Sequence, residues 1–181
     1  DYCQGYTNTL HFHAWEDGYR KIKAVTDSEL MRSAADVALI TPFHAFTVGG
    51  YRILPLEANH DPASSPVFYR VEGDGKSLLY GNDTGYFSEK VGAELKKAGR
   101  LDLVSLDCTG GVRTGWRDGH MCLETDLEVF RRMEKEGIAD ERTIKVINHF
   151  SHNGGATYDE LAAEAAKYGV VVSFDGLEIE F

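Results

Sequence analysis

Tyr80–Tyr86 reads YGNDTGY and directly follows the apolar end of Ser77–Leu79. The apolar run predicts a short buried strand that ends at Gly81, with the carboxylate of Asp83 at its tip. A carboxylate that a rigid sheet holds on a turn is a common oxygen ligand for a hard cation. Because an Asp in a turn often bonds to its own backbone, this residue alone does not identify a site.

Further chemistry-bearing residues follow other predicted strands. The residues at these strand ends are His60, Asp83, Asp107 and His149. Ligands of open α/β sheets bind at the carboxyl ends of the strands, so we expect these side chains to share one edge. Imidazole and carboxylate groups are the ligands that proteins offer to zinc, manganese or iron.

The order of elements predicts an α/β fold in layers, because hairpins come first and strands then alternate with helices. We expect strands over Val37–Val48, Tyr51–Leu56, Val67–Val71, Lys76–Tyr80, Leu101–Leu106, Thr143–Ile147, Val170–Phe174 and Leu177–Phe181. We expect helices from Asp27 to about Ala35 and over Ser88–Ala98, Leu123–Glu136 and Tyr158–Tyr168. No linker or repeat divides the chain, so residues 1–181 are interpreted as a single domain.

The central strands are apolar without interruption, which is typical of a sheet that helices cover. We therefore expect burial, on adjacent strands, of Leu103, Val104, Val146, Ile147, Val171 and Val172.

Two further histidines, His11 and His13, lie on a predicted strand over Leu10–Trp15. Residues two apart on a strand share a face, and zinc sites use such pairs. A single pair is weak evidence, so we interpret both as surface or packed histidines.

Composition restricts the partners. The net charge of −10 disfavours a nucleic-acid groove, and no apolar run is long enough to cross a bilayer. The three cysteines, Cys3, Cys108 and Cys122, are widely spaced, which fits reduced thiols in the cytoplasm. We expect a small-molecule substrate or a metal as partner and no membrane association. A homodimer is left open.

Several motifs occur in an order that resembles a known family. They are ANHD at 58–61, YGNDTGY at 80–86, LDCT at 106–109, DGHM at 118–121, INHFSHNGG at 147–155 and SFDGLEIEF at 173–181. From about Leu39 onward the chain resembles the metallo-β-lactamase fold, and within it the phosphodiesterase branch. It is similar to the phosphoribosyl cyclic phosphodiesterases and, more distantly, to ribonuclease Z.

The resemblance implies a role for each matching residue. His60 matches the lone histidine on the first metal, Asp83 the bridging aspartate, and His149 the histidine on the second metal. His120 matches the histidine that these enzymes place beside the leaving group as general acid. The implied cofactor is a pair of divalent ions, zinc or manganese, with iron as an alternative.

One motif of the family is absent from this sequence. The signature H-x-H-x-D-H supplies two ligands to each metal, and His11-Phe12-His13 continues with Trp15 and Glu16 where Asp and His are required. We expect the signature upstream of Asp1, so that the chain forms part of an αββα sandwich that is incomplete at its N-terminus.

The resemblance predicts a metal-dependent hydrolase that acts on a small phosphodiester through a metal-activated water. Thioester or lactone hydrolysis on the same fold is one alternative. A non-catalytic binding module without metal is another, and the absent signature favours it. In the Gly-rich loop Gly110–Gly119, Arg113 and Arg117 are candidates for contact with a phosphate, and a solvated loop is the alternative.

Overall fold

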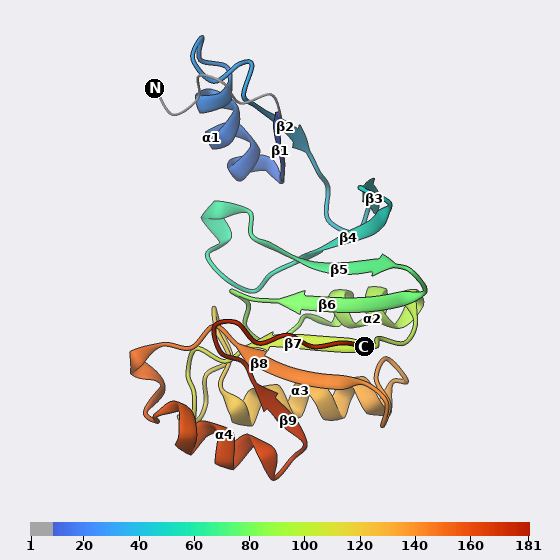
Figure 1. The fold of residues 1–181 in the computed structure, drawn as a ribbon, viewed down its shortest axis with the longest axis vertical. Coiled ribbons are helices and arrows are strands. Elements are labelled where there is room, and N and C mark those ends of the chain that lie inside the picture. The colour runs from blue at the N-terminus through green and yellow to red at the C-terminus, as the bar shows by residue number, and fades with distance from the viewer. Residues whose placement is uncertain (1–8) are drawn as a thin grey trace.

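A computed structural model describes residues 9–181, and its main element is a sheet of seven strands (Figure 1). The strands lie side by side in chain order: β3 (Phe46–Val48), β4 (Tyr51–Glu57), β5 (Val67–Gly73), β6 (Lys76–Gly81), β7 (Leu103–Asp107), β8 (Ile144–Asn148) and β9 (Val170–Val172). Pairing is antiparallel from β3 to β6 and parallel from β6 to β9. The α/β class predicted from the sequence is confirmed.

Two tight turns produce the antiparallel half of the sheet. Gly49 and Gly50 join β3 to β4, and both have positive φ angles, of 56° and 90°. Asp74 and Gly75 join β5 to β6 in the same way, with φ angles of 52° and 75°. Two consecutive residues with positive φ are the requirement of the hairpin turn that matches strand twist. The hairpins expected in the first half of the chain are therefore confirmed, as β3–β4 and β5–β6.

Helices connect the parallel strands, which cannot be joined by tight turns. They are α2 (Glu89–Ala98), α3 (Leu123–Lys135) and α4 (Tyr158–Ala166). The side chains of Ser88 and Thr157 cap α2 and α4, and Thr157 forms a capping box with Glu160. All three helices pack on one face of the sheet, in a single apolar core with Val104, Leu106 and Ile147.

Burial of the central strands follows the prediction with one exception. Leu103, Val104, Val146, Ile147 and Val172 are buried, but Val171 is 39% exposed. The prediction for Val171 is wrong because β9 is an edge strand whose alternate side chains point away from the helices. The predicted strand over Leu177–Phe181 is also wrong, since no strand forms there.

The N-terminal part forms a separate small sheet, which Figure 1 shows at one end of the molecule. Its strands, β1 (Leu10–Ala14) and β2 (Ala35–Leu39), are parallel and are joined through α1 (Glu16–Thr26). None of the helices described is long and apolar enough to span a membrane.

Two predictions fail in this N-terminal part. The helix lies before Asp27, not after it, because the acids of its first turn and the pair Asp17–Lys21 stabilise residues 16–26. The predicted strand Val37–Val48 is two strands, β2 and β3, in different sheets. Pro42 lies in the break and has no N–H with which to continue a ladder.

Candidate active site

The chemistry-bearing residues lie at one edge of the seven-stranded sheet. Strands β4, β6, β7 and β8 all run in the same direction, so their carboxyl ends share an edge. His60 follows β4, Asp83 follows β6, Asp107 ends β7 and His149 follows β8. Sheet topology therefore assembles residues that lie up to 89 positions apart in the chain.

Asp83 lies at the centre of this group, with two histidines directed toward one of its oxygens. Its Oδ1 is 3.3 Å from Nε2 of His149 and 3.7 Å from Nε2 of His60. Two ligands bound at about 2.0–2.1 Å to a tetrahedral ion lie about 3.4 Å apart. Each separation, with its donor types, therefore fits a divalent metal shared by Asp83 and that histidine.

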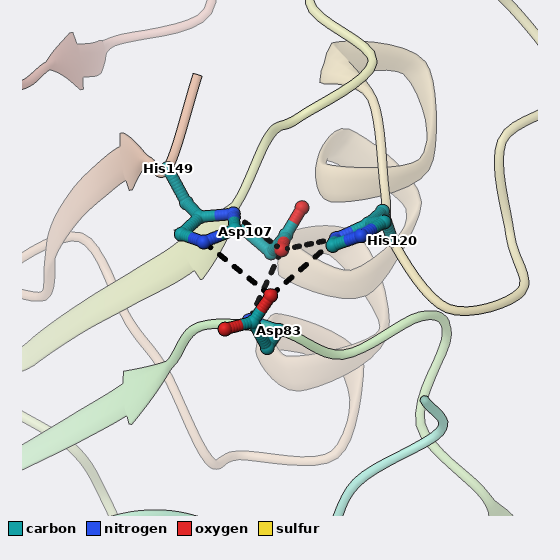
Figure 2. A group of neighbouring side chains, drawn as sticks. All are labelled: Asp83, Asp107, His120 and His149. Atoms are coloured by element: carbon teal, nitrogen blue, oxygen red, sulfur yellow. Dashed lines mark hydrogen bonds and ion pairs between the residues drawn. The ribbon is translucent and has the colours of Figure 1, made fainter. Parts of the chain in front are cut away.

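Asp107 lies beside Asp83 in the same group and is more enclosed; contacts join His120 and His149 to both carboxylates (Figure 2). The Asp107 carboxylate is fully buried and accepts a hydrogen bond from Nδ1 of His120 at 2.9 Å. Three backbone N–H groups also donate to it, those of Asp83 at 3.0 Å, Thr109 at 2.9 Å and Met121 at 3.3 Å. The buried charge is thus compensated by donors on every side, as an enclosed carboxylate requires.

The hydroxyl of Thr109 orients His149. It donates to the carbonyl of His149 at 2.9 Å and lies 2.8 Å from Nδ1 of the same residue. With its proton directed to the carbonyl, the hydroxyl oxygen accepts the N–H of Nδ1, which leaves Nε2 with a free lone pair toward Asp83. Such a hydrogen bond on the remote nitrogen is the usual partner of a metal-binding histidine.

The backbone is strained at two of these positions. Asp83 has a φ of 48° and His149 a φ of 60°, in a region that residues with a side chain rarely adopt. Such conformations cluster at functional sites, where the surrounding structure holds them.

The structure brings three of the four predicted site residues, Asp83, His120 and His149, into one cluster with Asp107. Oxygen or nitrogen atoms of Asp83, Asp107, His120 and His149 lie within 4.8 Å of one another. The ring of His60 lies edge-on to that of His120, with centroids 4.9 Å apart. Their proximity is shown, whereas the metal and acid roles stay predictions.

Sequence reasoning placed Asp107 at a strand end but gave it no role, and it gave none to Thr109. The donors to Asp107 come from positions 83, 109, 120 and 121, so its function depends on contacts that no local pattern records. The acid at the end of an apolar strand was the available signal.

Other candidates have structural partners. His11 pairs with Asp36, and His13 stacks on Phe46, as expected for surface or packed histidines. Arg117 pairs with Glu128 and lies over the ring of Tyr86, and Nε of Arg113 donates to the carbonyl of Asn153. Both arginines thus have partners within the protein. Cys108 and Cys122 are buried free thiols, and Cys3 lies outside the described residues.

Three solved structures have a similar fold. The metallo-beta-lactamase fold protein YhfI from Bacillus subtilis has a TM-score of 0.68 and 16% identity, over 96% of this chain and 66% of that one. A diphosphatase of the PhnP family has a TM-score of 0.66 and 18% identity, over 96% and 59%. Zn(2+)-bound PqqB from Methylobacterium extorquens has a TM-score of 0.63 and 17% identity, over 96% of this chain and 66% of that one. The chain thus spans 59–66% of the length of these proteins.

Sequence comparison gives the family itself. No curated protein matches the sequence. A model of the family described as "Beta-lactamase superfamily domain" matches residues 8–149, well over half of the chain. Proteins of this fold family are generally metal-dependent hydrolases. The chain therefore belongs to the beta-lactamase superfamily, and its fold is that of the metallo-β-lactamase proteins.

Proposed function

We propose that this protein is a metal-dependent hydrolase of a small phosphodiester, with His60, Asp83 and His149 as metal ligands and His120 as general acid. The observation that carries the proposal is the 2.9 Å hydrogen bond between Nδ1 of His120 and buried Asp107, beside a group with the spacing of metal ligands. This arrangement supports a proton donor next to a cation site.

The donor set suits zinc or manganese. A divalent cation, when bound, acts as a Lewis acid toward a phosphoryl oxygen and lowers the pKa of water. Asp83 has a side chain that is 56% exposed, so its oxygens are open to such an ion. His149 presents Nε2 because Thr109 occupies Nδ1.

His120 has the geometry of a proton donor to a leaving group. The hydrogen bond to Asp107 occupies Nδ1 and fixes the ring, as a buried aspartate does for a catalytic histidine. The other nitrogen, Nε2, can then give its proton to the departing alkoxide. A general acid of this kind contributes about a hundredfold or more to turnover.

The test compares leaving groups in the complete protein loaded with zinc or manganese. His120→Ala should lower turnover of an alkyl phosphodiester by about a hundredfold and that of a nitrophenyl ester much less, because nitrophenolate leaves without a proton. Metal content, measured by plasma mass spectrometry, should not change. His11→Ala, which removes an exposed histidine of β1, is the control and should match the wild type.

The same assay decides between the alternatives. Turnover of thioesters or lactones without turnover of phosphodiesters would assign the reaction to a carbon centre. A complete protein that binds no metal and hydrolyses none of these compounds would support the alternative of a non-catalytic binding module. If His120→Ala removed the metal, or slowed both leaving groups equally, the acid role would have to be abandoned.

A further inference from the structure

Three segments that carry His60, Asp83 and His120 are joined by backbone hydrogen bonds. The N–H of Gly85 donates to the carbonyl of Asn59 at 2.8 Å, and the N–H of Tyr86 donates to the carbonyl of Arg117 at 2.8 Å. The segment at 84–86 therefore lies between the segment before His60 and the loop before His120.

The side chain of Asn59 closes the gap between the outer two segments. Its Nδ2 lies 3.3 Å from the carbonyl of Arg117, 3.3 Å from Oδ1 of Asp118 and 3.5 Å from the carbonyl of Tyr86. Its backbone N–H donates to the hydroxyl of Thr84, which is fully buried. One residue thus contacts all three segments.

Gly85 permits this close approach. A Cβ atom at position 85 would lie 2.2 Å from the carbonyl oxygen of Arg117 and 2.9 Å from Nδ2 of Asn59. Because the first obstacle is backbone, any side chain at position 85 would displace the loop that leads to His120. Gly85, by lacking a side chain, and Asn59, through its amide, therefore both allow close contact with the carbonyl of Arg117.

We propose that Asn59 and Gly85 form a clasp that positions His120 relative to His60 and Asp83. Asn59 is a positioning residue, since it acts through the Arg117–Asp118 segment and touches no reacting atom. This inference rests on the proposed role of His120, and it adds which contacts hold that histidine over the site. A displacement of about 1 Å can cost about a hundredfold in rate, so modest loosening has a measurable effect.

The first experiment uses Asn59→Ala in the complete, metal-loaded protein. Turnover of an alkyl phosphodiester should fall about tenfold, while a nitrophenyl ester and the metal content change little, because the loss reaches the reaction only through His120. Thr157→Ala, which removes the cap of α4, is a control that loses stability away from the site. It should slow both esters equally or not at all. Equal slowing of both esters by Asn59→Ala would overturn the positioning role.

A rescue tests the contact itself. Asn59→Asp places a carboxylate about 3.3 Å from Oδ1 of Asp118, so like charges should separate the two segments. Adding Asp118→Asn restores a donor and an acceptor with their positions exchanged. The double variant should recover part of the activity lost by Asn59→Asp toward the alkyl ester. Losses that simply multiply in the double variant would contradict a direct contact.

Amide hydrogen exchange tests the clasp without any assay of activity. Asn59→Ala should speed exchange of the Tyr86 amide, whose N–H donates a hydrogen bond to the carbonyl of Arg117. Amides of β7 and β8 should keep their exchange rates. If the wild type hydrolyses no phosphodiester, the proposed function fails and faster exchange still supports the clasp. If it does and the Tyr86 amide is unaffected, the clasp is wrong and the function stands.

Discussion

Two aspartates at the ends of neighbouring strands have opposite surroundings. Asp83 follows β6 and has a side chain that is 56% exposed, whereas Asp107 ends β7 and is fully buried. Three histidines, His149, His60 and His120, have a ring nitrogen 3.3, 3.7 and 3.9 Å from Oδ1 of Asp83, too far for a strong hydrogen bond. The two shorter separations are close to the spacing of ligands around an ion. Asp107 instead accepts hydrogen bonds from His120 and three backbone N–H groups, at 2.9–3.3 Å, and Nδ1 of His149 lies 3.2 Å from it.

The difference shows how one residue type serves two purposes at the same edge. The open oxygens of Asp83 are available to a cation, which is the expected charge partner for an acid between imidazole rings. Both oxygens of Asp107 already accept hydrogen bonds, so this residue orients its neighbours. We infer that exposure, and not the strand end as such, separates ligand from positioning residue.

The largest effect should come from removing the exposed carboxylate. Asp83→Ala should reduce bound zinc or manganese to background in the complete protein and abolish turnover, because both histidines lose their common partner. Plasma mass spectrometry after dialysis measures the metal. Asp74→Ala is a matched control at the other end of β6, since Asp74 is also an exposed turn residue with positive φ. Metal retention by Asp83→Ala would contradict the comparison.

Changing the buried carboxylate should have a smaller and different effect. In Asp107→Asn the amide can present its NH2 group to Nδ1 of His120, which disfavours the required tautomer. We expect turnover of an alkyl phosphodiester to fall by about a hundredfold, with metal affinity reduced by about tenfold or less.

A double variant shows whether Asp107 acts through His120. In the His120→Ala background, Asp107→Asn should cost little additional activity, because residues that act as a unit are not additive. Independent losses would mean that Asp107 acts directly on metal or substrate, and the proposed division between the two aspartates would then be wrong.

Removing one hydroxyl should have a weaker effect on the metal side of the site. Thr109→Val keeps the shape of the side chain but removes the partner of Nδ1 of His149. We expect about tenfold weaker binding of zinc in a calorimetric titration, the effect of losing a hydrogen bond behind a ligand. At saturating zinc, turnover should recover to near the wild-type value, because Nδ1 of His120, which lies 3.2 Å from the same hydroxyl, keeps its hydrogen bond to Asp107. An unchanged affinity for zinc would show that Thr109 does not orient His149 as a metal ligand.

The sequence predicts the regular part of the fold because its signals are local. The hairpins follow from residues such as Gly49-Gly50, and α2 from the cap at Ser88 and its apolar spacing. Predictions fail where the outcome depends on distant partners. Val171 is exposed because its strand lies at the edge, and β2 pairs with β1 instead of continuing toward the hairpin.

The candidate site divides in the same way. His60, Asp83, His120 and His149 could be identified from strand ends, a Gly-rich loop and ordered motifs. The functions of Asp107, Thr109 and Asn59 could not, because each depends on contacts with residues 13 to 59 positions away. A sequence pattern can place a charged side chain at an edge, but the donors around it appear only in the folded chain.

The smallest predicted effect concerns a third acid, Asp126 on α3, and it extends the comparison to a carboxylate without the donors of Asp107. Asp126 is fully buried, and neither of its oxygens has a hydrogen-bond partner among the described residues. Burial raises its pKa well above the usual range; the Cys108 thiol opposes this rise, and the nearby charge of Asp107 adds to it.

A raised pKa in the folded state predicts the sign of a pH effect on stability. Well below pH 4, Asp126 is protonated in both states, so its ionisation takes no stability from the folded state. As pH rises, the unfolded chain ionises while the folded chain keeps its proton, so the free energy of unfolding falls. Asp126→Asn removes this loss, so at pH 7 we expect Tm to rise by about 2–4 °C, equivalent to about 1 kcal/mol. Calorimetry at pH 7 and pH 4.5 measures the difference, which should shrink at the lower pH. A difference of the same size at both values would show that the variant acts through packing, and that Asp126 is not the uncompensated counterpart of Asp107.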